Sequence, residues 1–442
     1  MAHYVPHTDR EIASMLEFIG LGSLDELFDC VPEALRLAGG LEIPIGLSEF
    51  DSAGEMERLA RLNIGADLIC FAGGGSYDHD VPSAVRRLAG RTEFVTAYTP
   101  YQPEVAQGVL QALFEYQTMV ARLSGLEIAN ASLYDGATAL VEGVNLAVAA
   151  TGRQRVWLSD GVHREWAEVV TTFAAGTGHD IEVVPLRNGV TAWPPTEEAP
   201  GAVVVQYPNR LGVLDDMAAA AAAAKATGAM LVVAFDPIAA AVLKSPGEWG
   251  ADVAVGEGQP FGTPMSFGGP YLGLFAAKLD HVRRIPGRLV GETADPEGRR
   301  AFTTTLRTRE QDIRREKASS NVCTNQTLIA VTAMIQMGWL GKAGLVDVAT
   351  QCARGTRYAR EALLALDGVT PLVDGPVLRE FTVATPVAGD TLVERMADEG
   401  FLAGTRTDDG EGNEGLLVAV TEKRTKAEID SYVAAFSKAV KV

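Results

Sequence analysis

Short apolar runs alternate with amphipathic segments through the middle of the chain. The apolar runs predict strands over 156–158, 181–186, 202–207 and 230–235, and the amphipathic segments predict helices over 163–175 and 214–227. Short apolar strands that alternate with helices are typical of a mostly parallel sheet that is covered on both faces. The pattern therefore predicts a doubly wound α/β domain.

The two ends of the chain have different patterns. Residues 1 to about 95 look helical, with capping-box patterns that start at Thr8, Ser23 and Ser52. From about residue 355, helices and alternating strands predict a small α+β unit, with strands at 372–374, 380–384 and 416–420 and helices at 390–399 and 426–440. We expect three parts, which are a helical arm (1–95), a large α/β domain (96–350) and a small α+β domain (351–442).

A carboxylate and a glycine-rich loop follow two successive apolar runs that look like buried parallel strands. Asp236 ends the run 230–235, and the loop with Gln259 follows the next run. Ligands bind at the carboxyl ends of strands in open α/β sheets, and Tyr207 to Asn209 lie at the same edge. Pyridoxal phosphate (PLP) enzymes use such an Asp for the pyridinium nitrogen and a loop Lys for the Schiff base. Gln259 stands where that Lys is expected, so the frame of the site is present without its nucleophile.

Two further turns permit a ligand-binding and a structural interpretation. The run Gly73–His79 fails the dinucleotide and P-loop patterns, so a tight turn is favoured, with His79 in a surface hydrogen bond. The turn Tyr134–Thr138 opens a helix, whose backbone N–H groups can hold a phosphate. Plain capping by Asp135 is the alternative, and it is favoured unless the architecture supports a cofactor.

Three polar regions lie outside this frame. The rigid aromatic loop Tyr98–Glu104 is equally compatible with a substrate wall and a structural elbow. Cys323 precedes a long apolar helix and is interpreted as a buried thiol. A basic region predicts ion pairs or a subunit contact, and its arginines are Arg283, Arg284, Arg288, Arg299, Arg300, Arg307, Arg309, Arg314 and Arg315.

Composition narrows the class of protein. The 442 residues carry a formal net charge of −19, which disfavours nucleic acid and anionic membranes as partners. The four cysteines show neither disulfide nor zinc spacing, and residues 1–7 lack the blocks of a signal peptide. We therefore expect a cytoplasmic protein.

Several strings along the whole chain resemble one family. They include Arg91–Glu104, Phe114–Gln117, Gln206–Asn209, Val255–Pro260, Ser266–Gly273, Pro286–Glu292, Thr308–Gln311, Ile313–Ala318 and Ser320–Gln326. Strings of this kind, in this order, are similar to those of the alpha subunit (subunit 1) of the two-subunit glycine dehydrogenase (decarboxylating), the P-protein of the glycine cleavage system.

The resemblance implies a fold, a cofactor and partners. The implied fold is the aspartate-aminotransferase-like type (PLP fold type I). The beta subunit (subunit 2) would hold the PLP on its lysine in an α2β2 complex, and Gln259 would be a property of the alpha type. Glycine would lose carbon dioxide, and its aminomethyl group would pass to the lipoyl arm of the H-protein.

The resemblance also implies residue roles. Asp236 and Thr138 would be remnants of an ancestral cofactor site. The residues that would face the partner's active site are Tyr98, Tyr101, Gln102, Glu104, Thr324 and Asn325. Two other interpretations stay open, which are a PLP enzyme that acts alone through Lys244 or Lys278, and a pseudoenzyme that scaffolds or regulates a partner.

Overall fold

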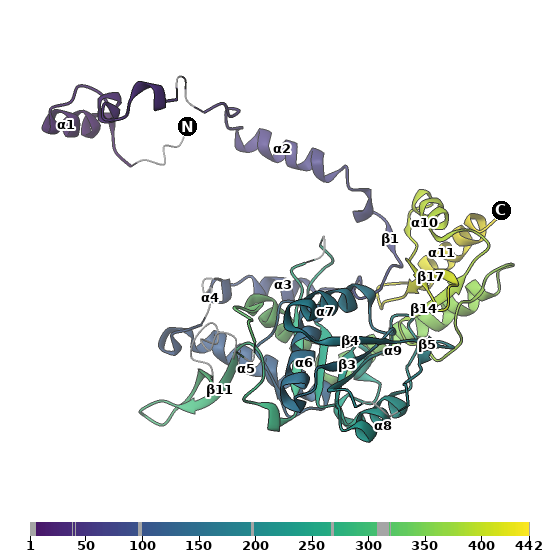
Figure 1. Ribbon diagram of the computed structural model, residues 1–442. Coiled ribbons are helices and arrows are strands. Elements are labelled where there is room, and N and C mark those ends of the chain that lie inside the picture. The colour runs from purple at the N-terminus through teal and green to yellow at the C-terminus, as the bar shows by residue number, and fades with distance from the viewer. Residues whose placement is uncertain are drawn as a thin grey trace. The chain divides into compact units, whose positions relative to one another are not determined.

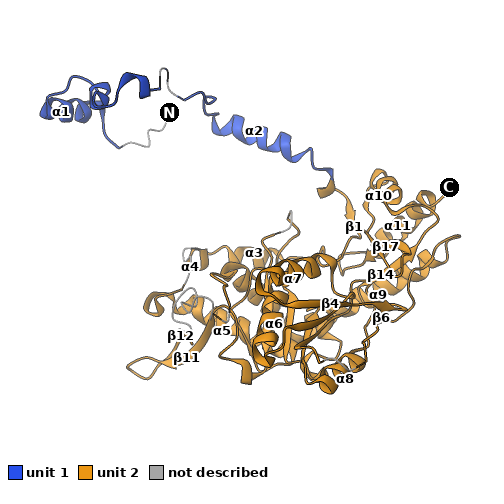
Figure 2. Cartoon of the chain, viewed as in Figure 1, with its two compact units in different colours: residues 1–64 blue, residues 65–442 orange. Residues whose placement is uncertain are grey.

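The computed structural model of the protein describes residues 6–37, 39, 41–95, 100–195, 199–266, 269–306, 318 and 320–441. Contacts within the chain divide it into two compact units, residues 1–64 and 65–442 (Figure 2). The division falls inside the arm that we predicted as 1–95. The predicted boundaries at 95/96 and 350/351 stay predictions.

The described residues of unit 1 form two α-helices, α1 (Asp9–Ile19) and α2 (Glu49–Ala60). Thr8 and Glu11 form the predicted capping box at the start of α1. The prediction of a helix start at Ser52 is wrong, because Ser48 caps α2 one turn earlier and leaves Ser52 inside the helix. Like Ser52, Ser48 has a hydroxyl that can accept the backbone N–H of the N3 residue. The predicted and the observed helix starts therefore differ only by one turn of the helix.

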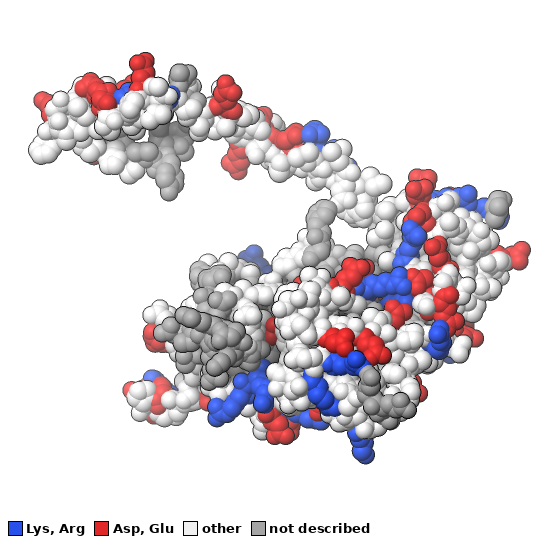
Figure 3. Space-filling view, viewed as in Figure 1, with Lys and Arg blue, Asp and Glu red and all other residues white. Residues whose placement is uncertain are grey.

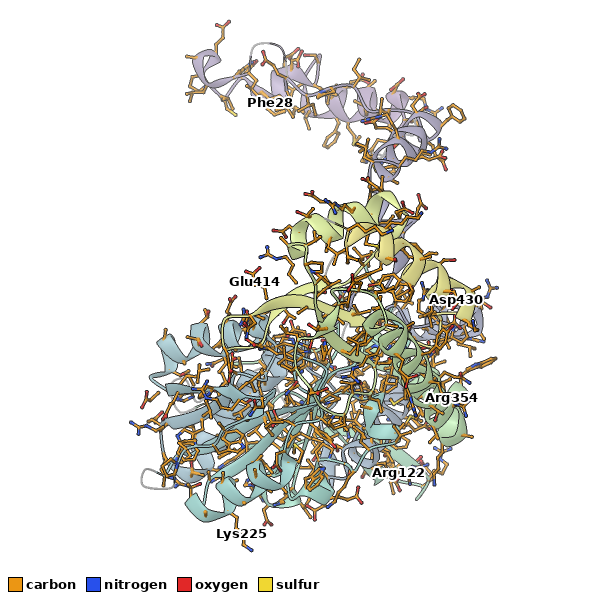
Figure 4. All side chains as sticks on the ribbon, turned by 90° about the vertical axis from the view of Figure 1, so that its right-hand side faces the viewer. Phe28, Arg122, Lys225, Arg354, Glu414 and Asp430 are labelled. Atoms are coloured by element: carbon orange, nitrogen blue, oxygen red, sulfur yellow. The ribbon has the colours of Figure 1, made fainter. Side chains whose placement is uncertain are left out.

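Unit 1 buries almost none of its apolar side chains. Leu16 is the buried residue among those described in this unit, whereas Phe18 and Ile45 are 90% exposed and Phe50 is 87% exposed. Figure 4 draws the side chains of the protein as sticks, with Phe28 of this unit labelled. Exposed apolar surface on this scale marks a segment that packs against something else.

A seven-stranded sheet forms the centre of unit 2 (Figure 1), in the order β2-β10-β9-β8-β7-β3-β4. Its neighbours pair in parallel from β9 to β4, and β10 is antiparallel to both of its neighbours. The bounds are β2 (Ile128–Ala129), β3 (Arg155–Ser159), β4 (Asp180–Val184), β7 (Ala202–Tyr207), β8 (Met230–Phe235), β9 (Val253–Glu257) and β10 (Gly273–Ala277). The predicted mostly parallel sheet is confirmed.

Alternate residues of the buried strands enter two separate cores, one on each face of the sheet. Leu231 and Val233 lie in the core that also contains residues of α5, α8 and α9, whereas Val232 and Ala234 lie in the core with α6 and α7. The bounds are α5 (Pro103–Ser124), α6 (Gly136–Thr151), α7 (Arg164–Thr177), α8 (Met217–Thr227) and α9 (Thr327–Leu364). The shorter elements of this part are α3 (Ser83–Ala89), α4 (Thr92–Val95), β5 (Leu186–Arg187), β6 (Val190–Thr191), β11 (Leu289–Ala294) and β12 (Arg300–Thr305).

The long helix α9 is apolar along much of its length. Within the described part of the chain, it is the helix that is long and apolar enough to cross a membrane. Buried residues such as Ala330 and Met337 lie in the core with α5, and the helix is kinked at Gly341, where φ is +59°. A core helix with such contacts has the same composition as a membrane span.

The small domain is a four-stranded antiparallel sheet with two helices. It consists of β13 (Thr370–Pro371), β14 (Glu380–Ala384), β16 (Thr405–Asp408), β17 (Glu414–Ala419), α10 (Gly389–Asp398) and α11 (Lys426–Ala439). Residues that we expected in a helical arm belong to it. β1 (Ile69–Cys70) pairs with β15 (Phe401–Leu402), and the Phe71 ring stacks 4.0 Å from that of Tyr432. The all-helical expectation is wrong here, because these apolar residues fill the small-domain core.

Charged side chains of both signs are interspersed over the face that Figure 3 shows. Within the basic region, Arg299 pairs with Asp295 at 2.7 Å and Arg300 with Glu292 at 2.8 Å, as the ion-pair interpretation predicts. Arg307, Arg309, Arg314 and Arg315 lie outside the described residues. Exposed pairs of this kind contribute less than about 1 kcal/mol each.

Candidate functional site

The carboxyl ends of β7, β8 and β9 meet around a small cavity. Asp236 follows β8, Glu257 ends β9, and Gln206 to Asn209 end β7 and the turn after it. The cavity measures about 40 Å³, which is enough for water. The predicted convergence of polar strand tips at this edge is confirmed.

An arginine of the small domain occupies the end of β8. Arg379 pairs with the Asp236 carboxylate at 2.5 Å, and its guanidinium carbon lies 3.4 Å from the centre of the Tyr77 ring. The Arg379 side chain is 3% exposed. In a PLP enzyme, the Asp at this position pairs with the ring nitrogen of the cofactor. Here the Asp236 carboxylate pairs with Arg379 instead.

Gln259 is fully buried and is hydrogen-bonded through both ends of its amide. Its Oε1 accepts from the Tyr77 N–H at 3.1 Å, and its Nε2 donates to the Tyr77 and Thr263 carbonyl oxygens at 3.0 and 2.7 Å. The Tyr77 hydroxyl donates to the Glu380 carboxylate, and burial raises the pKa of Glu380. The amide therefore fixes the Tyr77 segment in the place where a lysine would face a cofactor.

The amino terminus of α6 is filled by the chain's own acids. Asp135 forms a capping box with Thr138, as the capping alternative predicts. The Glu257 carboxylate accepts the Gly136 N–H at 2.9 Å, where a phosphate would bind. Burial raises the pKa of Glu257 to about 8, although three backbone N–H donors oppose the shift. The Trp166 ring covers the same turn, because a Cβ on Gly136 would lie 2.2 Å from it.

His79 is buried at the junction with the small domain, so the expected surface hydrogen bond is wrong. Its Nε2 accepts from Arg379 at 2.7 Å, and its Nδ1–H donates to Glu422 at 2.6 Å. Although burial opposes it, these bonds and the Asp80 N–H hold the pKa of Glu422 down to about 2. Cys352 lies beside this pair, but the histidine has no nitrogen left for a metal ion.

These contacts test whether PLP fits this chain, and it does not. Asp236 pairs with Arg379, Glu257 occupies the α6 terminus, and the buried amide of Gln259 stands where the sequence pattern calls for the lysine. Lys278 binds Asp252 at the opposite end of β9, and Lys244 lies over the Trp249 ring. Neither lysine lines the cavity, which disfavours a PLP enzyme that acts through either one.

We expect the Gln259→Lys substitution not to create a PLP site, because the other positions that the cofactor needs stay occupied. After incubation with PLP, the variant should show no more visible absorbance than the wild type and no borohydride-reduced cofactor on the introduced lysine. The Gln259→Met variant controls for the loss of the amide hydrogen bonds. A stable chromophore on the introduced lysine would contradict this account of the pocket.

A second group of predicted residues lies on another part of unit 2. Tyr98 lies outside the described residues. Tyr101, Gln102 and Glu104 are exposed at the start of α5, and Tyr101 is 43% exposed. Arg288 donates to the Tyr101 hydroxyl at 3.2 Å and to Asn325 Oδ1 at 2.6 Å. The structure thus brings together two sequence positions that lie more than 200 residues apart.

The segment with Thr324 and Asn325 is held by the loop after β2. The backbone N–H groups of Cys323 and Thr324 donate to the Tyr134 hydroxyl at 3.1 and 3.2 Å. Cys323 is only partly buried, which corrects the buried-thiol expectation, and its backbone N–H bonds to Tyr134. Ser132 has a φ of +137°, a strained value for a residue other than glycine.

Several residues of the two sites were missed by sequence reasoning. Arg379 precedes and Glu380 begins a strand that was predicted only from its apolar pattern, and Ser132 carries no sequence signal of its strained backbone. Arg288 was grouped with the other arginines of the basic region. The available signal was the string Pro286–Glu292, which resembles the family. It places Arg288 directly after Pro286 and Gly287, apart from the arginines that are interspersed with acids.

The fold belongs to the PLP fold type I class. An alanine–glyoxylate aminotransferase from Nostoc superposes with a TM-score of 0.58 and 14% identity, over 93% of this chain and 99% of the aminotransferase, which shows the fold alone. In this class the chain is a member whose own cofactor pocket is filled by protein side chains.

The chain belongs to the glycine cleavage system P-protein family, whose model matches residues 2–436. It is 45% identical over 436 residues to the probable glycine dehydrogenase (decarboxylating) subunit 1 of Desulforamulus reducens, which covers 97% of both chains. A crystal structure of glycine decarboxylase (P-protein) in inhibitor-bound form superposes with a TM-score of 0.89 and 44% identity, over 99% of this chain and 100% of the other.

Proposed function

We propose that this chain is the lysine-lacking subunit of a decarboxylating glycine dehydrogenase and completes the active site of a partner, subunit 2. The observation that carries the proposal is the filled pocket, where Arg379 pairs with Asp236 at 2.5 Å and Gln259 replaces the lysine. The relatives are named subunit 1, which supports the existence of a second subunit. PLP on the partner would supply an electron sink for the loss of carbon dioxide from glycine.

The exposed polar residues support the contribution of this chain. Tyr101, Gln102 and Glu104 are exposed on a turn that Pro100 and Pro103 stiffen, and α5 carries this turn on the core of the large domain. A hydroxyl, an amide and a carboxylate on a rigid support can bind and orient a small polar substrate. Closure by a second chain would exclude water and strengthen these interactions.

Apolar surface supports an extensive protein partner. In unit 1, Phe18, Ile45 and Phe50 are at least 87% exposed, and in unit 2 Trp339 on α9 is 59% exposed. Tryptophan and phenylalanine are enriched in the centres of subunit interfaces. We propose subunit 2 as the partner that covers them, in an α2β2 complex.

The lipoyl arm of the H-protein would accept the aminomethyl group. We also propose a cytoplasmic location.

The test uses this chain and the candidate partner, each alone and mixed, with PLP, glycine and lipoylated H-protein. We expect glycine-dependent release of carbon dioxide only from the mixture, and borohydride-reduced cofactor only on a lysine of the partner. Reduced cofactor on Lys244, Lys278 or another lysine of this chain, with activity in the isolated chain, would overturn the proposal.

A scaffolding role is the second candidate, and substitution of exposed residues tests it. If this chain completes the site, Tyr101→Phe and Glu104→Gln should each lower kcat/KM at least about tenfold, with the complex intact by gel filtration. Glu115→Gln is the matched control, because Glu115 lies on α5 about 16 Å further along the helix. Unchanged turnover in both test variants would favour scaffolding.

A further inference from the structure

Asn325 uses its whole side-chain amide inside this chain. Its Oδ1 accepts from Arg288 at 2.6 Å and from the Thr327 hydroxyl at 3.0 Å. Its Nδ2 donates to Ser132 Oγ at 2.9 Å and to the Ala131 carbonyl oxygen at 3.3 Å. A primary amide has two donor and two acceptor positions, and all four are used here.

The orientation of this amide follows from Arg288. A guanidinium only donates, so the atom that faces Arg288 is the oxygen, and the Nδ2 group must face Ser132. Ser132 Oγ also accepts from the Gln326 N–H at 3.2 Å, which fixes the segment on both sides of Asn325. The strained backbone of Ser132, with φ of +137°, places its hydroxyl between these two donors.

Arg288 joins this segment to the exposed loop. Its guanidinium donates to the Tyr101 hydroxyl at 3.2 Å and lies 5.4 Å from the centre of the Tyr101 ring. Arg288 itself is 6% exposed, whereas Tyr101 is 43% exposed. The buried cation therefore holds an exposed aromatic side chain from behind.

We propose that Arg288 and Asn325 are a positioning pair, which orients the Tyr101 side chain and the Cys323–Gln326 backbone toward the partner's active site without touching the substrate. The inference rests on the proposed function and changes the expected role of Asn325, which then supports the site from within. Lysine cannot replace Arg288, because its single ammonium cannot present a planar fork to Tyr101 and Asn325 together.

A double-mutant cycle on the reconstituted two-chain enzyme tests the pair. Arg288→Lys should lower kcat/KM by roughly 10²-fold, mainly through kcat. In the Tyr101→Phe, Asn325→Ala background, Arg288→Lys should add less than about threefold, because the two side chains that Arg288 positions are gone. Multiplicative effects, or a change in KM alone, would overturn the proposal in favour of direct substrate contact. Arg284→Lys is the matched control, since Arg284 is exposed four residues earlier.

Amide hydrogen exchange on the isolated chain gives a readout that needs no activity. Arg288→Lys should speed exchange at Cys323, Thr324 and Gln326, whose N–H groups bond to Tyr134 and Ser132, and Arg284→Lys should not. Unchanged protection in Arg288→Lys would overturn the proposal. If the wild-type mixture has no glycine activity, the proposed function fails by itself, and hydrogen exchange still decides whether Arg288 fixes this segment.

Discussion

Replacement of Arg379 by methionine is expected to lower the free energy of unfolding by about 3–5 kcal/mol. The substitution removes the cation that pairs with Asp236 at 2.5 Å and bonds to His79 at 2.7 Å. It leaves the buried Glu380 and the partly buried Asp236, whose side chain is 13% exposed, without that counter-charge, because methionine carries no charge. Urea unfolding of the isolated chain measures the loss.

Two variants make this result specific to the buried pair. Arg406→Met removes an arginine that pairs with Asp390 at 2.8 Å but is 52% exposed, and it should cost less than about 1 kcal/mol. Adding Asp236→Asn to Arg379→Met should recover part of the loss, because the unpaired charge is then removed as well. A loss in Arg379→Met no larger than that of the control would contradict the central role of this pair.

Acid is expected to destabilise the protein through His163. Burial, with smaller effects of Arg379 and Arg210 against that of Asp236, lowers the pKa of His163 from 6.5 to about 4. Between pH 6.5 and about 4, His163 therefore binds a proton in the unfolded chain but not in the folded chain. Stability is unaffected by His163 above pH 6.5 and declines as the pH falls toward 4, where the loss amounts to about 3 kcal/mol.

Urea unfolding at several pH values measures this dependence. His163→Gln should flatten the decline of stability between pH 6.5 and 4, since glutamine takes up no proton in this range. His7→Gln, at an exposed histidine of unit 1, is the control and should leave the decline unchanged. The same steep decline in His163→Gln as in the wild type would show that His163 does not cause it.

Local sequence pattern was sufficient for much of the sheet. The predicted strands 202–207 and 380–384 have the bounds of β7 and β14, because a short apolar run between turn residues has few other ways to bury its side chains. The prediction failed where two apolar residues form a strand with a partner that is distant in the sequence. Ile69 and Cys70 form β1 only because Phe401 and Leu402 lie beside them.

Some residues of the candidate site could likewise be predicted from the sequence, and others could not. Asp236 and Gln259 were identified from sequence, since both follow apolar runs and one lacks the chemistry that its position calls for. Arg379 was missed, because its partner His79 lies 300 residues away. Tyr101 and Asn325 were expected through resemblance, whereas Arg288, which bonds to both, was interpreted as part of a mixed-charge surface.

The sequence by itself determined the α/β class and the family, and it predicted the absence of the lysine, because each depends on residue types in local order. The tertiary structure decided which side chains fill the cofactor pocket and which residues hold the exposed loop at Tyr101. Those answers depend on which side chains meet across β8, β14 and the loop after β2. Hydrogen bonds and ion pairs act over a few ångströms in space, and folding brings such groups together from distant positions in the chain.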